Sequence, residues 1–278
     1  MNFWKYILGF LTLISIAVWL AVFTYPDDKL HIIACDVGQG DAILATYGTT
    51  QILVDGGPDS SVVSCLGRHM PFWDRQVELL IVTHPQLDHF GGMVDVVRRY
   101  NVGQFLWNGQ DANTEGWKTL RSELDNRKIP MNQLSSGYKI RYSNLHFDIL
   151  HPDQDFIGRD INEYSIINTI SFGEFDVLLT GDIMPPATDI AAPLVRPVEV
   201  LKVPHHGSKN GLTQLFLENA APGLAVISVG EKNRYGHPSP ETLQLLEESG
   251  IKILRTDRDG EVEVISDGKS WRFFRGYD

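Results

Sequence analysis

The chain has 278 residues, of which 43% are hydrophobic and 21% charged, enough for one large globular domain or two small ones. Its formal net charge of −11 argues against a protein that holds nucleic acid on a broad basic face, but not against a nuclease whose carboxylates surround metal ions. Cys35 and Cys65 are too few for a disulfide framework or a thiolate metal site, and we expect both to be small buried hydrophobic residues.

The first element in the chain is a predicted transmembrane helix. No charged residue occurs over residues 6–26, a length that can cross the hydrocarbon core of a bilayer. Aromatic residues suited to the membrane interface lie near its ends, at Trp4, Tyr6, Trp19 and Tyr25. A cleaved signal peptide is the alternative, but bulky side chains occupy the place where cleavage needs small ones. We expect an uncleaved anchor over residues 1–26, a linker over 27–30 and one domain over 31–278.

The charges that flank this helix predict its orientation. Lys5 precedes the apolar segment, and Asp27 and Asp28 follow it. The positive-inside rule then places the N-terminus in the cytoplasm and the domain outside it. The expected location is therefore membrane-anchored, single-pass and extracytoplasmic.

Residues 31–44 predict a strand, a glycine-bearing turn and a second strand. Gly38 and Gly40 let the backbone bend and approach a ligand without a side chain in the way, and Asp36 and Asp41 flank the turn. A further strand over residues 51–54 ends at Asp55, which two glycines follow. Such turns occur in ordinary hairpins, but their position just ahead of a histidine cluster favours the rim of an active site.

That cluster follows the apolar run Leu79–Val82, which predicts a fully buried strand. His84, Gln86, Asp88 and His89 come within seven residues of its end. Imidazole and carboxylate groups gathered on one strand-to-helix turn favour a bound zinc, manganese or iron ion over a chance polar loop.

The rest of the chain alternates between predicted helices and strands. Helices are expected at residues 60–69, 93–100, 115–127, 212–220 and 240–249. Strands are expected at residues 77–82, 104–107, 138–140, 145–150, 165–171, 175–179, 198–203, 224–229, 252–254, 261–265 and 271–274. Asp182 follows one of these strands, and His205 and His206 follow another. An α/β sandwich with one metal centre at the rim of its sheets accounts for all these strand ends together.

Three motifs resemble the metallo-β-lactamase superfamily of hydrolases. They are His84-x-Gln86-x-Asp88-His89-x-Gly91-Gly92, Thr180-Gly181-Asp182 and Pro204-His205-His206-Gly207-Ser208. More narrowly, residues 36–42, 202–208 and 235–238 resemble the extracytoplasmic hydrolase domain of the ComEC-type competence proteins. The resemblance covers nearly everything after the anchor. Since one membrane segment is predicted in place of that family's multi-helix channel, the chain is a free-standing form of the domain or a relative with another substrate.

The resemblance implies an αββα four-layer sandwich, the metallo-β-lactamase fold, with a site for one or two divalent metal ions between the sheets. It assigns a first site to His84, Gln86 and Asn162, and a second to Asp88, His89 and His205, with Asp182 bridging. The alternative that His206 is the ligand stays open. Because Gln86 and Asn162 offer only neutral carboxamides, we expect a tight ion in the second site and a weaker one in the first, where Mn²⁺ is favoured over Zn²⁺.

Further roles follow from the same resemblance. Asp88 would orient the attacking water, and His206 or His237 would protonate the leaving group, although His237 is as well explained by loop hydrogen bonds. The expected substrate-binding residues are Gly207, Ser208, Lys209 and Tyr235. The residues expected to orient the ligands from behind are Asp36, Asp41 and Asp55.

Three functions remain. The leading one is a metal-dependent phosphodiesterase or nuclease that acts on DNA outside the cytoplasm during DNA uptake, with the membrane and a separate ComEC-like channel protein as partners. The second is a hydrolase of another substrate, such as a wall-polymer phosphodiester or a lactone-type ester. The third is a non-catalytic metal-binding relative.

Overall fold

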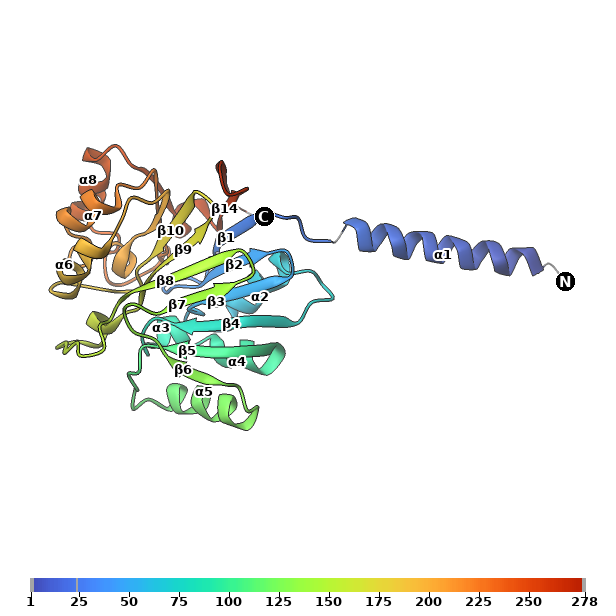
Figure 1. Ribbon diagram of the computed structural model, residues 1–278, viewed down its shortest axis with the longest axis horizontal. Coiled ribbons are helices and arrows are strands. Elements are labelled where there is room, and N and C mark those ends of the chain that lie inside the picture. Colours follow the sequence, from blue (N-terminus) through green and yellow to red (C-terminus); the bar gives the residue numbers. More distant parts are fainter. Residues whose placement is uncertain (1–2, 24, 277–278) are drawn as a thin grey trace.

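The computed structural model describes residues 3–23 and 25–276. Residues 1, 2 and 24 of the predicted anchor segment, and residues 277 and 278 of the predicted domain, lie outside the described residues. One long helix leads into two β-sheets that carry helices on their outer surfaces (Figure 1).

The helix α1 (Phe3–Phe23) precedes the rest of the fold. Within the described residues it is the one helix long and apolar enough to cross a membrane, a test that a signal sequence also passes. Two of its aromatic side chains are largely exposed, Trp4 at 78% and Trp19 at 61%. The prediction of an apolar N-terminal helix is confirmed.

The first sheet has eight strands in the order β15-β14-β1-β2-β3-β4-β5-β6. Strands β3 to β6 are parallel to one another, and the other neighbours are antiparallel. The strands are β1 (Leu30–Ala34), β2 (Ile43–Tyr47), β3 (Thr50–Val54), β4 (Gln76–Val82), β5 (Asn101–Trp107), β6 (Met131–Gln133), β14 (Val262–Ser266) and β15 (Trp271–Arg275).

The second sheet has seven strands in the order β13-β12-β11-β10-β9-β8-β7. Strands β10 to β13 are parallel, and β7 to β10 are antiparallel. The strands are β7 (Lys139–Tyr142), β8 (Leu145–His151), β9 (Ile167–Phe172), β10 (Phe175–Leu179), β11 (Val200–Lys202), β12 (Leu224–Ile227) and β13 (Lys252–Arg255).

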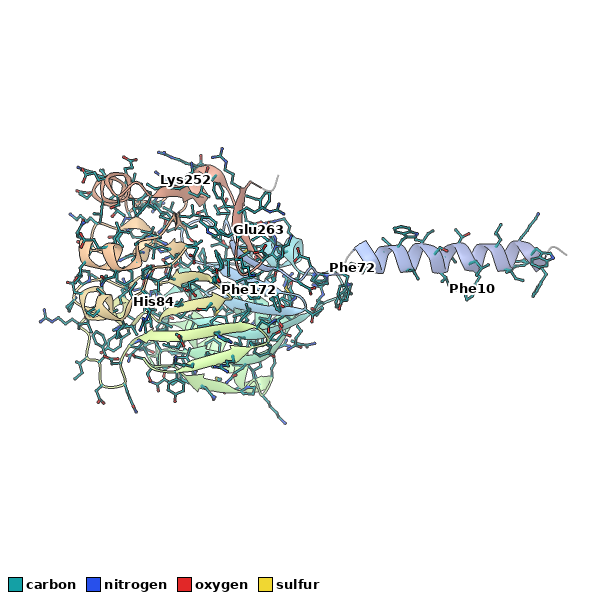
Figure 2. All side chains as sticks on the ribbon, turned by 45° about the horizontal axis from the view of Figure 1, so that its top comes forward. Phe10, Phe72, His84, Phe172, Lys252 and Glu263 are labelled. Carbon is teal, nitrogen blue, oxygen red and sulfur yellow. A yellow bond between two sulfur atoms is a disulfide. The ribbon has the colours of Figure 1, made fainter. Side chains whose placement is uncertain are left out.

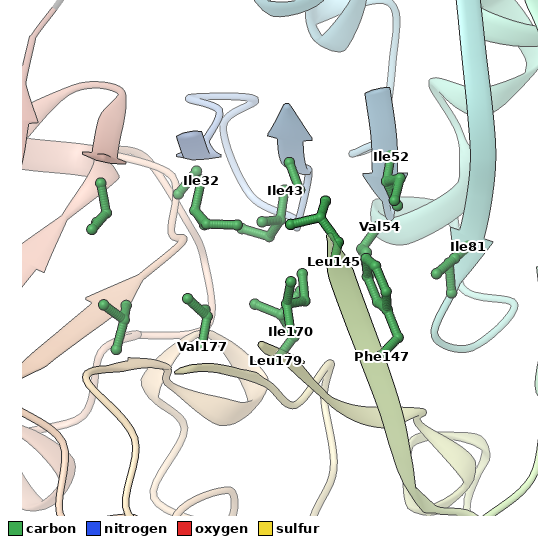
Figure 3. Packing of buried hydrophobic residues seen from close by; sticks show 14 of the residues in the cluster. Ile32, Ile43, Ile52, Val54, Ile81, Leu145, Phe147, Ile170, Val177 and Leu179 are labelled. Carbon is green, nitrogen blue, oxygen red and sulfur yellow. The ribbon is translucent and has the colours of Figure 1, made fainter. Parts of the chain in front are cut away.

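The two sheets share one apolar core (Figure 3). In β8 the inward residues Leu145, Phe147 and Ile149 are at most 2% exposed, and the residues between them are more exposed. This alternation follows from the pleat of a strand, which points successive side chains to opposite faces. Ile43 and Ile81 of the first sheet belong to the same core.

Helices cover the outer face of each sheet and complete four layers. Buried residues of α2 (Ser61–His69), α4 (Met93–Arg99) and α5 (Glu115–Asn126) share a cluster with the first sheet. Buried residues of α6 (Ala187–Ala191), α7 (Gln214–Ala220) and α8 (Pro240–Glu248) share one with the second. The predicted αββα sandwich is confirmed. The short helices are α3 (Leu87–Phe90), α9 (Thr256–Asp259), η1 (Ile161–Tyr164), η2 (Ala192–Leu194) and η3 (Pro204–Gly207).

Some features differ from the sequence-based expectations. The strand β6 was not predicted because Met-Asn-Gln lacks an apolar pattern, and α6 was missed because it is only five residues long. The expectation that Cys35 and Cys65 are independent buried residues is wrong. Both are 1% exposed, but they form a disulfide, because α2 packs over the end of β1 and brings together residues 30 apart in sequence.

Candidate metal centre

The histidines and aspartates singled out in the sequence meet because strand ends from both sheets meet. His84 and the helix α3 follow β4, Asp182 follows β10, and η3 follows β11. The carboxyl ends of parallel strands lie at one edge of a sheet, so these residues share one rim. Figure 2 shows His84 at the end of the domain opposite to α1.

His89 is held by a buried carboxylate behind it. Its Nδ1 lies 2.8 Å from Asp55 Oδ2, while the backbone N–H and the hydroxyl of Thr83 donate to Asp55 at 2.8 and 2.7 Å. The imidazole Nε2 then faces Asp182 Oδ2 at 3.3 Å. This is the arrangement in which a carboxylate fixes the tautomer of a metal-binding histidine.

His206 is fixed in the same way by a backbone carbonyl. Its Nδ1 lies 2.9 Å from the Ser228 carbonyl oxygen, and its Nε2 lies 3.2 Å from Asp182 Oδ2 and 3.6 Å from Asp88 Oδ2. His205 and His206 both have positive φ, at 51° and 54°, a backbone conformation that is uncommon for residues other than glycine. The turn buries His206 at 2% exposed and leaves His205 at the cavity, with its Nε2 3.8 Å from Asp182.

Four side chains form a set that suits a metal ion. One ligand atom from each of Asp88, His89, Asp182 and His206 lies within 4.8 Å of the others. The Nε2 atoms of both histidines and Oδ1 of Asp182 are buried without a hydrogen-bond partner, and buried polar atoms are ordinarily paired. Nitrogen and oxygen donors of this kind fit zinc or manganese. The buried His/Asp cluster is therefore consistent with metal binding, and its metal is not identified by the donors alone.

A second group of unpartnered atoms lies beside this set. His84 is fully buried, with its Nδ1 near the hydroxyls of Thr83 and Ser165 and its Nε2 without a partner. The Asn162 Oδ1 is also buried without a partner, and Asn162 and Gln86 line a cavity together with Asp88, Asp182 and His206. The weaker site at His84, Gln86 and Asn162 stays a prediction.

The charges and the burial in the cluster give its histidines different pKa values. Burial alone would lower the pKa of His89 and of His206, but the carboxylate of Asp182, with Asp55 for His89 and Asp41 for His206, raises each pKa well above its ordinary value. Burial and the neighbouring charge of His89 lower the pKa of His84 to about 3, so His84 is a neutral imidazole with a free lone pair at physiological pH.

Lys202 also lies in the cluster, although no role was predicted for it from the sequence. It is 2% exposed, its Nζ contacts Asp41 Oδ2, and it donates to the Gly181 carbonyl at 3.1 Å. Asp41 also faces His206 Nδ1 at 3.4 Å. Although burial opposes ionisation, Lys202 and His206 hold the pKa of Asp41 well below its usual range. A single lysine among the apolar residues of the run 200–203 was the signal that could have found it.

The glycine turn of residues 38–41 touches the site through its backbone. A side chain at Gly40 would place its Cβ 2.3 Å from the Asp88 carbonyl oxygen, and the Asp41 N–H donates to that oxygen at 3.1 Å. This turn therefore packs closely against the strand-to-helix turn that carries Asp88, and its expected approach to a ligand stays a prediction. Asp36 is exposed and only accepts from the Gly38 N–H within the turn.

A cavity of about 480 Å³ opens over the cluster. Its lining residues are Gln39, Pro58, Gln86, Leu87, Asp88, Asn162, Asp182, His205, His206, Tyr235 and His237. Tyr235 stacks on His237 with ring centroids 5.8 Å apart, and His237 Nδ1 is buried without a partner. Gly207, Ser208 and Lys209 are not in the lining, and the Ser208 N–H donates to the His205 carbonyl within its own loop.

The two packed sheets, their outer helices and the His/Asp cluster at the rim define a domain of the metallo-β-lactamase fold. The metallo-β-lactamase fold protein YhfI from Bacillus subtilis is similar to this chain with a TM-score of 0.55 and 13% identity, over 82% of this chain and 97% of that one. No family model matches the chain.

Sequence comparison goes further than the fold. ComE operon protein 3 of Bacillus subtilis is 27% identical over 90% of this chain and 35% of its own length. Competence protein ComA of Neisseria gonorrhoeae is 26% identical over 86% of this chain and 32% of its own length. The chain is therefore a homologue of the ComEC-type competence proteins over most of its length, and it spans about a third of the relatives it matches.

Proposed function

We propose that this chain is a metal-dependent hydrolase of phosphodiesters, acting as a ComEC-type nuclease on DNA outside the cytoplasm. The observation that carries the proposal is the convergence of unpartnered buried nitrogen and oxygen atoms of His89, His206 and Asp182 beneath an open cavity. The similarity to a protein named for competence supports DNA as the substrate.

Four residues would hold the tighter ion, namely Asp88, His89, Asp182 and His206. We propose His206 for this set rather than His205, because His206 Nε2 is closer to Asp182 and is aligned by the Ser228 carbonyl behind it. His84, Gln86 and Asn162 would hold the weaker ion. A bound Zn²⁺ or Mn²⁺ supplies a water of lowered pKa and a positive charge opposite the phosphoryl oxygens.

The remaining chemistry belongs to residues that the substrate can reach. The Asp88 side chain is 29% exposed and lines the cavity, so its carboxylate can orient the attacking water and accept a proton from it. Burial lowers the pKa of His237, so His237 would be a neutral imidazole whose N–H donates a hydrogen bond to the leaving-group oxygen without giving up its proton. Tyr235 would hold the substrate at the cavity mouth.

A second candidate function rests on the charge of the cavity. Its lining includes neither lysine nor arginine among the described residues, whereas proteins that hold a nucleic-acid backbone commonly do so with basic side chains. This favours a smaller ester, such as a wall-polymer phosphodiester or a lactone-type ester. The carboxamides of Gln86 and Asn162 keep a non-catalytic metal-binding role as the third candidate.

The disulfide supports a location outside the cytoplasm. Cys35 and Cys65 are bonded and buried, and structural disulfides form and persist in oxidising compartments. We propose that α1 remains as a single-pass anchor and that a separate ComEC-like channel protein is the partner in DNA uptake.

The test uses the full chain in detergent, stripped of metal with a chelator and reloaded with Mn²⁺ or Zn²⁺. Single-stranded DNA, double-stranded DNA and bis-p-nitrophenyl phosphate are compared as substrates. Asp182→Asn removes a central ligand charge, and Asp125→Asn makes the same chemical change at an exposed aspartate of α5 that does not line the cavity. We expect metal-restored DNA cleavage that falls at least about 100-fold in Asp182→Asn and is unchanged in Asp125→Asn.

The other outcomes separate the candidates. Turnover of the small diester without DNA cleavage would move the substrate to the second function and leave the metal site intact. Metal binding without turnover of any ester would favour the non-catalytic relative. Equal loss in both aspartate variants would contradict the placement of the site.

A further inference from the structure

The domain carries exposed aromatic side chains at the end from which α1 leaves. Phe72 and Trp73 lie in the loop between α2 and β4 and are 70% and 47% exposed, and Tyr25 in the linker is 72% exposed. Tyr25 and Phe72 line one surface cavity, together with Pro26 of the linker. Figure 2 shows Phe72 beside the inner end of α1 and far from His84.

We infer that Phe72 and Trp73 insert into the headgroup layer of the membrane that holds α1, so that the domain docks on the bilayer by this loop. The inference rests on the anchor in the proposed function, and it is independent of the hydrolase chemistry. Tryptophan and tyrosine are enriched at membrane interfaces because an apolar ring carries one polar group. Two aromatic residues alone bind a bilayer weakly, but a tether makes the contact intramolecular.

The linker keeps this loop within reach of the bilayer. The helix α1 ends at Phe23 and β1 begins at Leu30, and residues 24–29 span at most about 22 Å when fully extended. The linker is also held against the domain, because His31 Nε2 lies 2.9 Å from Asp27 Oδ1 and His31 Nδ1 lies 2.6 Å from Glu263 Oε1. The aromatic loop therefore faces the membrane surface rather than bulk solvent.

The charges around the loop argue for apolar insertion instead of attraction to anionic lipid. Arg68 is paired with Glu261 at 2.6 Å, and Lys29 lies 4.0 Å from Asp27. Arg75 is also exposed just after the loop, but Asp74 precedes it, so the described residues around the loop carry mixed charge and not the basic cluster that binds lipid phosphates. Docking should therefore be insensitive to salt.

Docking by this loop sets the direction in which the site opens. Strand β4 starts just after Trp73 and ends just before His84, and a strand of seven residues spans about 23 Å. The metal cluster would then lie on the side of the domain away from the bilayer, and substrate would reach the cavity from outside the membrane.

The test places fluorescent reporters in the full chain, reconstituted into phosphatidylcholine vesicles with or without brominated acyl chains, which quench nearby tryptophan. The fluorescence of Trp73 is obtained by subtracting the fluorescence of Trp73→Phe from that of wild type. The same subtraction with Trp107→Phe gives the fluorescence of Trp107, a control tryptophan at the far end of β5. In the Trp73→Phe background, Phe72→Trp reports on the neighbouring loop position. Leu215→Trp, on α7 at the end away from α1 (Figure 1), is the matched exposed control.

We expect brominated lipid to quench Trp73 and the Phe72→Trp reporter at low and high salt, and to leave Trp107 and the Leu215→Trp reporter unchanged. Absence of quenching at positions 72 and 73 in chains that float with the vesicles would overturn docking while leaving the anchor intact. Equal quenching at position 215 would also overturn it, because the domain would not be oriented. Chains that fail to float would instead refute the anchor.

Discussion

Lys202 is buried between two carboxylates of the candidate metal centre. Its Nζ contacts Asp41 and lies 3.9 Å from Asp182 Oδ1. A buried ammonium group is tolerated only where opposite charge and hydrogen-bond acceptors surround it. We infer that Lys202 keeps Asp41 ionised and in place behind His206.

Replacing this lysine tests that role. Lys202→Met keeps the length of the side chain and removes its charge, leaving Asp41 buried without its cation. We expect a loss of about 3–5 kcal/mol in the free energy of unfolding, measured from the urea midpoint of the metal-free chain. Asp41→Asn in the same background should recover part of the loss, and Lys209→Met, at an exposed lysine, should change stability by less than about 0.5 kcal/mol. Independent, additive effects of the two buried substitutions would contradict the pairing.

His31 should make the stability of the domain depend on pH. Burial alone would lower its pKa, but hydrogen bonds to Glu263 and Asp27 raise it above the ordinary value of 6.5. A raised folded pKa means that this stabilisation is complete below about pH 6.5 and is lost as pH rises through the raised value.

The variant His31→Phe keeps a ring and removes the titration. We expect wild type to exceed the variant in thermal unfolding midpoint by more at pH 6 than at pH 9, since titrations common to both chains cancel in the comparison. A constant difference across this range would show that His31 does not carry the effect.

At the scale of elements, the disulfide ties a strand to the helix that covers it. Cys35 follows β1 and begins the turn that holds Asp41, while Cys65 is in the middle of α2. The Cys35 N–H donates to the Ala42 carbonyl at 2.9 Å, which closes the base of the turn. The bond therefore supports the turn that lies against Asp88.

Removing the bond should lower stability without changing the fold. For Cys35→Ala with Cys65→Ala we expect a loss of about 3–4 kcal/mol, the loop-closure value for a loop of this length. Urea unfolding measures it, and the reduced wild type is the matched comparison. If reduction leaves the midpoint where it was, the bond does not constrain the unfolded chain.

At the scale of the whole molecule, the apolar helix α1 and the end of the domain that carries His84 lie on opposite sides (Figure 2). Strand β4 connects the two ends, with its start beside the aromatic loop and its end beside His84. The side of the membrane on which the domain lies then decides whether Cys35 and Cys65 meet an oxidising environment.

Thiol labelling measures that sidedness. We expect the full chain, denatured directly from intact cells, to resist maleimide until a reductant is added, because Cys35 and Cys65 have been oxidised outside the cytoplasm. The same chain expressed without residues 1–26 should label at both positions, since the cytoplasm keeps thiols reduced. Labelling of the full chain without reductant would place the domain inside.

Strand and helix positions were predictable where local pattern determines them. The run Leu79–Val82 is buried as expected, and β10 has the predicted bounds. Predictions from the sequence failed where contacts between residues distant in the chain determine the structure. The strand β6 exists because β5 offers it a partner, and the cysteines pair because α2 lies over β1.

The sequence by itself determined the order of most strands and helices, the apolar N-terminal helix and the motifs that carry the candidate ligands, because hydrophobic periodicity and the spacing of glycine and histidine are local properties. The tertiary structure alone decided which of the adjacent His205 and His206 turns inward, through the two left-handed residues that follow β11. It also brought Lys202 against Asp41. The burial of one histidine and the Lys202–Asp41 contact both depend on the packing of one sheet against the other, because the residues that surround these side chains are far away in the chain.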